Sequence, residues 1–313
     1  MRIAQVAPLA EAVPPKLYGG TERIVSYLTE ELVAMGHEVT LFASGDSITS
    51  ANLEAVVPVA LRLDPESRDP VSPHVLAVTR VVDMLDQFDI VHFHIDHFQL
   101  PVMRERDTPY VTTFHGRLDL KELQPLMDAY PRAPFISISD SQRRPLKNVN
   151  WAGTILHGLP KDLLPMGQGE GGYLAFLGRI SPEKGPDAAI RIARAAGIPL
   201  KIAAKVDRRA LLMPICWPEP FGLVMIEAMS CGTPVIAFSH GSVPEVIDPG
   251  RSGFIVHDEV NAVAAVKRLG ELSRHKVRAC FEERFTARRM AEDHLALYHG
   301  MIAQQRPAVL RAV

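Results

Sequence analysis

Two glutamates flank the start of a predicted helix in the segment PEPFGLVMIEAMSCGTP, residues 218–234. Glu219 follows an apolar run in a loop, Gly222 begins the helix, and Glu227 falls inside it. A helix start presents free backbone N–H groups and the positive end of the helix dipole, which suits an anionic phosphate. Glu227 is then placed to bind the hydroxyls of a ribose joined to that phosphate, and Glu219 to face a transferred sugar. The alternative interpretation, two solvated glutamates at a helix end, is disfavoured by the surrounding pattern.

A second candidate segment, GRISPEKG at residues 178–185, also follows an apolar run directly. Arg179 and Lys184 would supply two positive charges to a leaving diphosphate, which activates the leaving group without a metal. Considered alone, an arginine and a lysine in a loop are more often surface charges. Because the glutamate segment accompanies them, we favour the diphosphate site.

Ligand-type side chains also gather within residues 92–97, namely His92, His94, Asp96 and His97. Alternate positions of a strand place the first two on one face, as a metal site would need. Contacts with an acceptor, or packing in a cleft wall, are the favoured interpretation. No two aspartates are spaced Asp-x-Asp, the arrangement with which metal-dependent sugar transferases hold a diphosphate-bound cation. We therefore predict no metal and expect basic side chains and helix dipoles to neutralise the diphosphate.

Short apolar strands alternate with helical patterns, which is typical of parallel sheets covered on both faces. In the first half, a strand at residues 3–6 precedes Gly19 and Gly20, and a helix runs from about Thr21 to a stop at Gly36. Further strands are predicted at residues 38–43, 90–93, 110–114, 135–139 and 154–156.

The pattern restarts after a polar, Gly- and Pro-rich linker at residues 158–172. Ser242 and Glu245 have the spacing of a capping box, which predicts a short helix there. The second half is predicted to contain a helix at residues 187–196 and strands at residues 173–177, 200–204, 211–215, 235–238 and 254–256. We predict two Rossmann-like α/β domains, residues 1–160 and 161–313, and it stays open whether the last helix packs back on the first domain.

One connection is too short for this scheme. Only Lys205–Ala210 separates two predicted parallel strands, whereas a parallel crossover needs a dozen or more residues. Either the chain has lost a helix-bearing unit, or the sequence skips residues at this point.

Composition sets the broad class. A chain of 313 residues with 47% hydrophobic and 22% charged residues fits two soluble globular domains. The formal charge of −2 argues against a nucleic-acid partner. The three cysteines lack CxxC spacing, which fits a reducing compartment, and the chain start lacks the apolar run of a signal peptide, so we expect the cytoplasm. Peripheral membrane contact stays open.

The chain resembles the retaining glycosyltransferases of family four, which have the two-domain GT-B fold. The matching motifs are GGTE at residues 19–22, GRISPEKG at residues 178–185 and EPFGLVMIEAM at residues 219–229. The resemblance covers nearly the whole chain, and the combination of motifs is specific although each motif alone is weak. It implies a hexosyltransferase that uses a nucleotide-diphosphate sugar as co-substrate, UDP-sugar being favoured over GDP- or ADP-sugar, and no other cofactor.

The resemblance also assigns roles to residues. Arg179 and Lys184 would hold the donor diphosphate, Glu227 the ribose hydroxyls and Glu219 the sugar hydroxyls. Gly19 and Gly20 would let the N-terminal loop approach the diphosphate, and His115, in TTFHGRLD, would lie near the reacting sugar carbon. The donor contacts would also include Phe221, Gly222 and Leu223. The acceptor, a saccharide, a lipid-linked glycan or a small molecule, is left open. The family carries a helix, a strand and a further helix at the short connection, so base recognition there is an open question.

Three other functions compete with this interpretation. A glycoside hydrolase would use Glu219 and Glu227 as paired acid and nucleophile, about 5–10 Å apart, but would have no use for the GRISPEKG loop. A non-catalytic or truncated family member would explain the short connection. A sugar-nucleotide epimerase of the same architecture is weaker, since the EPFG segment is not usual in such enzymes.

Overall fold

The computed structural model describes residues 1–168, 171–202 and 210–305, and these form two compact units. The N-terminal unit consists of Met1–Ile138, Pro145–Ile155 and the segment that begins at Ala287. The C-terminal unit consists of Ser139–Arg144 and Leu156–Thr286. The predicted boundary after residue 160 lies beside the point where the chain enters the C-terminal unit at Leu156.

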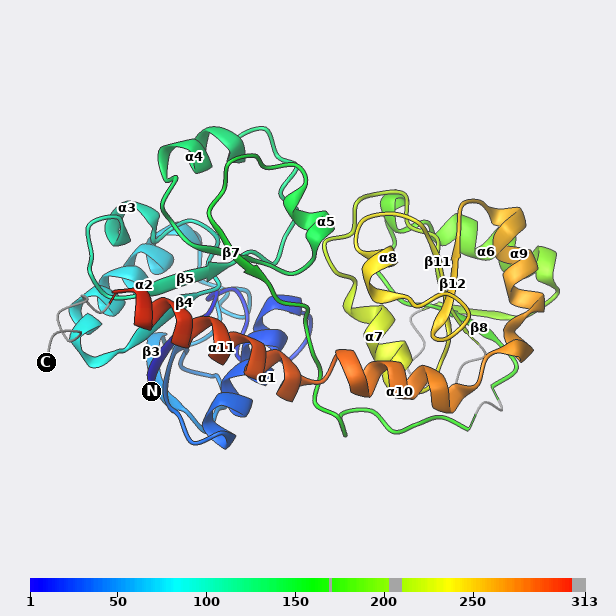
Figure 1. The fold of residues 1–313 in the computed structure, drawn as a ribbon, viewed down its shortest axis with the longest axis horizontal. Coiled ribbons are helices and arrows are strands. Elements are labelled where there is room, and N and C mark those ends of the chain that lie inside the picture. The colour runs from blue at the N-terminus through cyan, green and yellow to red at the C-terminus, as the bar shows by residue number, and fades with distance from the viewer. Residues whose placement is uncertain (169–170, 203–209, 306–313) are drawn as a thin grey trace, which may run out of the picture. The chain divides into compact units, whose positions relative to one another are not determined.

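A seven-stranded parallel sheet forms the centre of the N-terminal unit, in the order β3-β2-β1-β4-β5-β6-β7 (Figure 1). The strands are β1 (Arg2–Val6), β2 (Glu38–Ser44), β3 (Asn52–Val57), β4 (Ile90–Phe93), β5 (Tyr110–Thr113), β6 (Phe135–Ser137) and β7 (Trp151–Thr154). Every residue of β4 is buried, as expected for a central strand covered on both faces.

Helices cover this sheet. They are α1 (Gly20–Ala34), α2 (Val71–Asp83), α3 (Leu100–Met103), α4 (Leu123–Ala129) and α11 (Ala287–Gln305), with a 3₁₀ turn at Leu85–Gln87. Helix α1 buries Ile24, Leu28 and Leu32 and is followed by Gly36 at φ 83°, a left-handed residue that ends the helix. Helix α11 packs beside α1, so the end of the described chain belongs to the N-terminal unit (Figure 1).

The C-terminal unit has a five-stranded parallel sheet in the order β12-β11-β10-β8-β9. Its strands are β8 (Leu174–Phe176), β9 (Leu200–Ile202), β10 (Ala210–Met213), β11 (Val235–Phe238) and β12 (Gly253–Val256). Its helices are α5 (Asp140–Arg143), α6 (Pro186–Ala196), α7 (Leu223–Ser230), α8 (Val243–Val246), α9 (Glu259–Lys267) and α10 (Arg274–Arg284), with 3₁₀ turns at Pro182–Lys184 and Leu269–Glu271. Helices α6 and α9 pack side by side, and α7 packs on α10 (Figure 1).

Strand order determines where each unit can bind a ligand. In the N-terminal unit, the strands on one side of the β1–β4 boundary follow the order β1, β2, β3, and those on the other side the order β4 to β7. The C-terminal sheet has the same kind of switch point between β8 and β10. Open parallel sheets bind ligands outside the carboxyl ends of the strands at such switch points. The segments at residues 178–185 and 214–222 directly follow β8 and β10, so the sheet brings the two candidate motifs to one edge.

The prediction of two parallel α/β domains is confirmed, and most predicted elements lie within a residue or two of the observed ones. The strand predicted at residues 154–156 is wrong by about three residues, because Trp151 packs its ring against Phe114 and Phe135 and so starts β7 earlier. Strand β3 and helix α2 were not predicted: β3 is a largely exposed edge strand, and α2 leaves Val71, Val75 and Leu76 exposed.

The missing crossover unit was predicted at Lys205–Ala210, and apart from Ala210 this connection lies outside the described residues. Strands β9 and β10 both pair parallel with β8, on its two sides. The C-terminal sheet is therefore continuous across the described strands.

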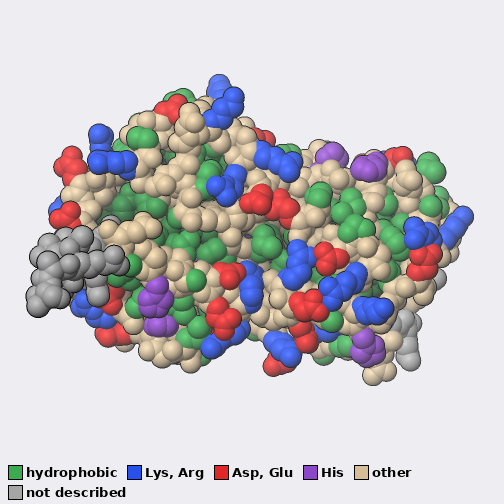
Figure 2. Space-filling model, viewed as in Figure 1, with side chains coloured by type: hydrophobic (Ala, Val, Ile, Leu, Met, Phe, Trp, Pro, Cys, Tyr) green, Lys and Arg blue, Asp and Glu red, His purple; other side chains and the backbone are tan. Residues whose placement is uncertain are grey.

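The surface carries charges of both signs. On the face shown in Figure 2, basic and acidic side chains are interspersed. In the described part of the chain, no helix combines the length and the apolar character needed to cross a bilayer.

Candidate active site

Lys184 and Glu219 form an ion pair at the switch point of the C-terminal unit. Lys184 ends the 3₁₀ turn after β8, and Glu219 lies in the loop after β10. The two side chains are only 17% and 12% exposed, so this pair is shielded from bulk water far better than an ordinary surface pair. The structure thus brings together the lysine of one predicted motif and the first glutamate of the other.

Trp217 completes this pair and was not predicted. Its indole N–H donates to Glu219 Oε2 over 3.0 Å, and its ring lies 4.6 Å from Lys184 Nζ. The indole therefore orients the carboxylate with its N–H and stabilises the ammonium with its π face. A tryptophan two residues before the glutamate was the available signal, but only the fold shows that both contacts are made by one ring.

The backbone that carries Glu219 is held at three successive carbonyl groups. The Glu219 carbonyl accepts from the Ser242 N–H at 3.0 Å, and the Phe221 carbonyl accepts from the Ser242 hydroxyl at 2.8 Å. The Pro220 carbonyl accepts from the Ser139 hydroxyl at 2.6 Å. Such a fully bonded loop keeps the glutamate in one place, as a preorganised site requires.

Glycines allow the chain to pass close to the ion pair on both sides. Gly185 directly follows Lys184 at φ 70°, and a Cβ there would meet the Pro214 carbonyl oxygen at 2.0 Å. Gly241, at φ 57°, lies against the Glu219 backbone, and a Cβ would meet its nitrogen and oxygen at 2.3 Å. No other residue fits these two positions without displacing the loops that carry the ion pair.

The predicted capping box at Ser242 and Glu245 is wrong. Helix α8 does begin at Val243, but the Ser242 side chain makes no capping hydrogen bond. It donates instead to Phe221, and the Glu245 carboxylate accepts from the backbone N–H groups of Asp140 and Ser141, at 2.7 Å each. Tertiary partners therefore take both side chains away from the local motif that their spacing suggests.

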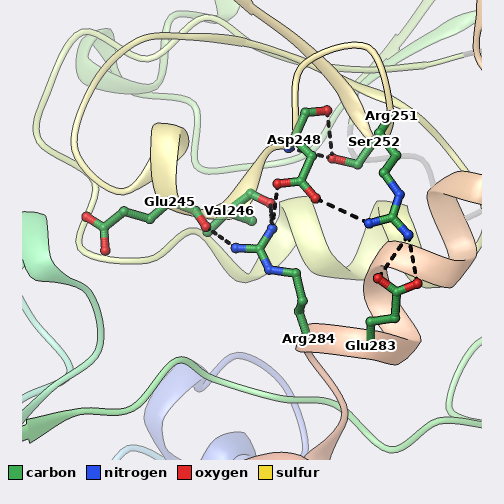
Figure 3. A network of polar contacts seen from close by, with 7 residues as sticks. All are labelled: Glu245, Val246, Asp248, Arg251, Ser252, Glu283 and Arg284. Carbon is green, nitrogen blue, oxygen red and sulfur yellow. Dashed lines mark hydrogen bonds and ion pairs between the residues drawn. The ribbon is translucent and has the colours of Figure 1, made fainter.

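An arginine network fixes the far end of α8 (Figure 3). The Arg284 guanidinium donates to the backbone carbonyls of Glu245 and Val246 and to Asp248 Oδ1, the last at 2.8 Å. Arg251 pairs with Glu283 at 2.7 Å and approaches Asp248. The loop that supports Glu219 is thus attached to α10 as well as to α5.

Helix α7 begins beside this site. Its N-cap, Gly222, has φ 79° and provides no side chain to cap the first N–H groups, and Leu223 is half-buried. Glu227 lies one turn further along the same helix and is also half-buried. Phe221 is 2% exposed and packs on His157 and Phe285, so only its backbone is available to a ligand.

Arg179 has a different partner from Lys184, which pairs with Glu219. It is 60% exposed and pairs with Glu183 over 3.4 Å. The structure therefore presents Lys184 as the shielded cation of the GRISPEKG segment and Arg179 as the solvated one.

In the N-terminal unit, His115 follows β5 and belongs to a buried histidine cluster. Its Nε2 lies 2.9 Å from His94 Nδ1, and His94 Nε2 lies 2.8 Å from Gln5 Oε1. His92 contacts Tyr298 on one side and Thr113 on the other, at 2.6 and 2.7 Å. The predicted common face of His92 and His94 is confirmed, with ring centroids 4.0 Å apart.

The suggested metal cluster does not form as a group. His92 and His94 lie in the core, whereas Asp96 and His97 are exposed and His97 stacks on Phe98. Over the described residues, no three His, Cys, Asp or Glu side chains are arranged to hold a metal ion. The histidines serve instead as hydrogen-bonding groups of the core.

Gly19 and Gly20 mark the start of α1. Gly19 is the N-cap, is buried and has extended backbone, and a Cβ there would meet the Glu22 carboxylate at 2.7 Å. Gly20 is exposed. Burial raises the pKa of Glu22, in the first turn of this helix.

The buried histidines make the free energy of unfolding depend on pH. Burial lowers the pKa of His115 to about 3 and that of His294 to about 4. Since the unfolded chain takes up protons near pH 6.5 and the folded chain does not, stability is present above that pH and is lost as pH falls below it. Each such histidine should contribute a slope of about 1.4 kcal/mol per pH unit between pH 6 and 5.

Urea unfolding at pH 7, 6 and 5 measures this slope. His294→Gln removes one buried imidazole and should reduce it, whereas His299→Gln, on the exposed side of the same helix, should leave it unchanged. An identical slope in wild type and His294→Gln would contradict the expectation.

Comparison with known proteins agrees with this geometry. The family model "Glycosyltransferase Family 4" matches residues 18–152, and "Glycosyl transferases group 1" matches residues 198–286. D-inositol 3-phosphate glycosyltransferase of Mycolicibacterium smegmatis is 28% identical over 252 residues, which span 67% of this chain and 50% of that protein. The chain thus spans about half the length of this curated relative.

Solved structures share the fold. AviGT4, a glycosyltransferase involved in avilamycin A biosynthesis, superposes with a TM-score of 0.76 at 20% identity over 97% of this chain and 98% of that one. Anabaena Alr3699/HepE in complex with UDP and glucose superposes with a TM-score of 0.69 at 16% identity, over 96% and 100% of the two chains. With two parallel-sheet units, and with family models that match in both, the chain belongs to the family 4 glycosyltransferases of the GT-B fold.

Proposed function

We propose that this protein is a retaining, metal-independent hexosyltransferase that moves a sugar from a nucleotide-diphosphate donor to an acceptor hydroxyl. The observation that carries the proposal is the shielded pair of Lys184 and Glu219 beside the uncapped start of α7. A cation, a carboxylate and free helix N–H groups at one sheet edge match the phosphate and hydroxyl groups of a nucleotide sugar.

Each group has a defined task in this reaction. Lys184 stabilises the negative charge that develops on the diphosphate as the bond from the sugar carbon to the phosphate oxygen breaks. The start of α7, at Gly222 and Leu223, provides N–H donors to the same phosphates, and Arg179 adds a second cation. In the structure, Glu219 is paired with Lys184. When Lys184 binds the donor diphosphate, the Glu219 carboxylate would be released to accept hydrogen bonds from the hydroxyl groups of the sugar.

The acceptor hydroxyl attacks on the face that the diphosphate leaves, which retains the configuration of the sugar carbon. The proton of the acceptor hydroxyl passes to the departing phosphate oxygen, so the released nucleoside diphosphate gains the proton that the acceptor loses. Glu227 is assigned to the ribose hydroxyls. We assign Gly19 and Gly20 to diphosphate approach and His115 to the reacting sugar.

We favour UDP-sugar as the donor, supported by the HepE structure that was solved with UDP and glucose. A saccharide, a lipid-linked glycan or a small molecule would serve as acceptor. Paired acid–nucleophile chemistry of Glu219 and Glu227 is not favoured, because Glu219 is bound by a lysine and an indole N–H.

A thermal-shift screen of UDP-, GDP- and ADP-sugars in the presence of EDTA tests the proposal. The correct donor at 100 times its Kd should stabilise the protein by about 2.7 kcal/mol. A separate assay of sugar transfer tests the metal: activity that continues in EDTA supports metal independence. No stabilisation by any nucleotide sugar would instead favour a non-catalytic family member.

A further inference from the structure

We infer that Gln5 and Tyr298 are positioning residues for His115, which they orient through His94 in one continuous hydrogen-bond relay. The inference rests on the proposed role of His115, and it adds residues that no sequence motif marks. The relay runs from the last described helix through two strands of the N-terminal sheet to the candidate active-site histidine.

The relay consists of buried groups whose donors and acceptors match. The Tyr298 hydroxyl lies 2.6 Å from His92 Nδ1 and 3.3 Å from Gln5 Nε2. Gln5 is fully buried and Tyr298 is 0% exposed, so neither can replace these partners with water. From Gln5, the chain continues through Oε1 to His94 and from His94 Nδ1 to His115.

The fold explains why these groups meet. Gln5 on β1 is the register partner of His92 on β4, and His94 follows the end of β4. His115 follows β5, the next strand along the sheet. Helix α11 contributes Tyr298, a residue whose hydroxyl would be costly to bury without the two partners it has here.

The Gln5 amide decides where the protons lie. With Nε2 directed at Tyr298, its Oε1 must accept from His94 Nε2–H, which leaves His94 Nδ1 as an acceptor. His115 then donates to it through Nε2–H, and its own Nδ1 carries a lone pair. A reversed amide would invert every bond and place the His115 proton on Nδ1. In the first arrangement the Tyr298 hydroxyl accepts from Gln5 Nε2–H and donates to His92 Nδ1, and burial, which raises the pKa of Tyr298, keeps that proton in place.

Neutral imidazoles are required throughout. A second proton on any of these buried rings would place a charge in the core, which is costly. Burial lowers the pKa of His92 and of His115 far below neutrality, which agrees with single protonation of each ring.

The consequence for the reaction is specific. A His115 ring held by Nε2–H cannot turn freely, and its remaining nitrogen accepts a hydrogen bond rather than donating one. This nitrogen is buried in the structure, so the relay fixes its protonation: in the role proposed for His115 it would accept from a hydroxyl of the sugar or of the acceptor and could not donate to one. A histidine of the opposite tautomer would repel that hydroxyl proton and bind an oxyanion instead.

Long-range ¹H–¹⁵N spectra of protein with ¹⁵N-labelled histidine report the tautomer directly, with His115→Gln used to assign the signal. We expect Nε2–H for His115 in the wild-type protein. Gln5→Met and Tyr298→Phe should both mix the two tautomers, whereas Tyr130→Phe, the same loss of a hydroxyl elsewhere in this unit, should leave His115 unchanged. Nδ1–H in the wild type, or no change in Gln5→Met, would overturn the relay.

Steady-state kinetics then distinguish a positioning role of Gln5 and Tyr298 from a purely structural one. Gln5→Met and Tyr298→Phe should lower kcat by about tenfold, with little change in KM for the donor, as for other residues that orient a functional histidine. An altered tautomer with unaltered kcat would overturn the positioning role. Because the spectra need no substrate, the relay can be confirmed even if the protein binds no nucleotide sugar, and the two failures remain distinguishable.

Discussion

Lys184→Ala should lower kcat/KM for sugar transfer by about 10²- to 10³-fold, the usual cost of removing one preorganised group that stabilises developing charge. The ammonium is 17% exposed and lies against the Trp217 ring, so its field acts in a partly desolvated site. Nucleoside diphosphate affinity should fall with it, and nucleoside monophosphate affinity should fall much less, since the outer phosphate is the one that the lysine would bind.

Lys267→Ala is the matched control. It removes the same charge from an exposed position near the end of α9 in the same unit. Its kinetics should equal those of the wild type. The substitution leaves Glu219 without its lysine, which can destabilise the fold. A circular dichroism spectrum of Lys184→Ala therefore checks that the variant is folded. Transfer at the wild-type rate in folded Lys184→Ala would exclude the diphosphate role.

The placement of Lys184 and Glu219 at one edge of the sheet could be anticipated from the sequence, although their ion pair was not predicted. Both residues lie just after apolar strands, and the carboxyl ends of neighbouring parallel strands meet at one edge of a sheet. Their separation of 35 positions in the sequence does not matter once the strands are placed side by side. Only short-range periodicity and one rule about sheets were needed.

The supporting contacts could not be anticipated. Ser139 and Ser242 hold the Glu219 loop through its backbone carbonyls, and a backbone carbonyl leaves no trace in the sequence. Ser242 even carries a misleading local signal, since its distance from Glu245 fits a capping box. Its hydroxyl nevertheless bonds Phe221, because the tight approach of the loop after β11 puts that carbonyl within reach.

The histidine cluster shows the same limit at longer range. Strand alternation correctly placed His92 and His94 on one face, and acceptor contacts or packing in a cleft wall were favoured over a metal site there. The partner of His92 that the sequence could not identify is Tyr298, 206 positions further along the chain. Its position depends on how α11 packs on the N-terminal unit, which periodicity alone does not specify.

Gly241→Ala should be the most damaging small substitution near the site, although Gly241 offers no side chain to a ligand. Its φ of 57° costs any other residue about 1–2 kcal/mol. In addition, the new Cβ would lie 2.3 Å from the Glu219 nitrogen and oxygen, which are backbone atoms that cannot turn aside. The Glu219 loop must move, and a displacement of about 1 Å of a catalytic group can cost about 10²-fold in rate.

Gly250→Ala separates strain from displacement. Gly250 has a similar φ of 77°, but a Cβ there meets nothing within 4 Å. Gly250→Ala should lower the free energy of unfolding only by the cost of placing alanine at a positive φ, and it should transfer sugar at the wild-type rate. Urea unfolding and kcat/KM of both variants provide the comparison. Equal activity of Gly241→Ala and Gly250→Ala would mean that the Glu219 loop tolerates displacement, and the rigid placement of this glutamate would then have no part in catalysis.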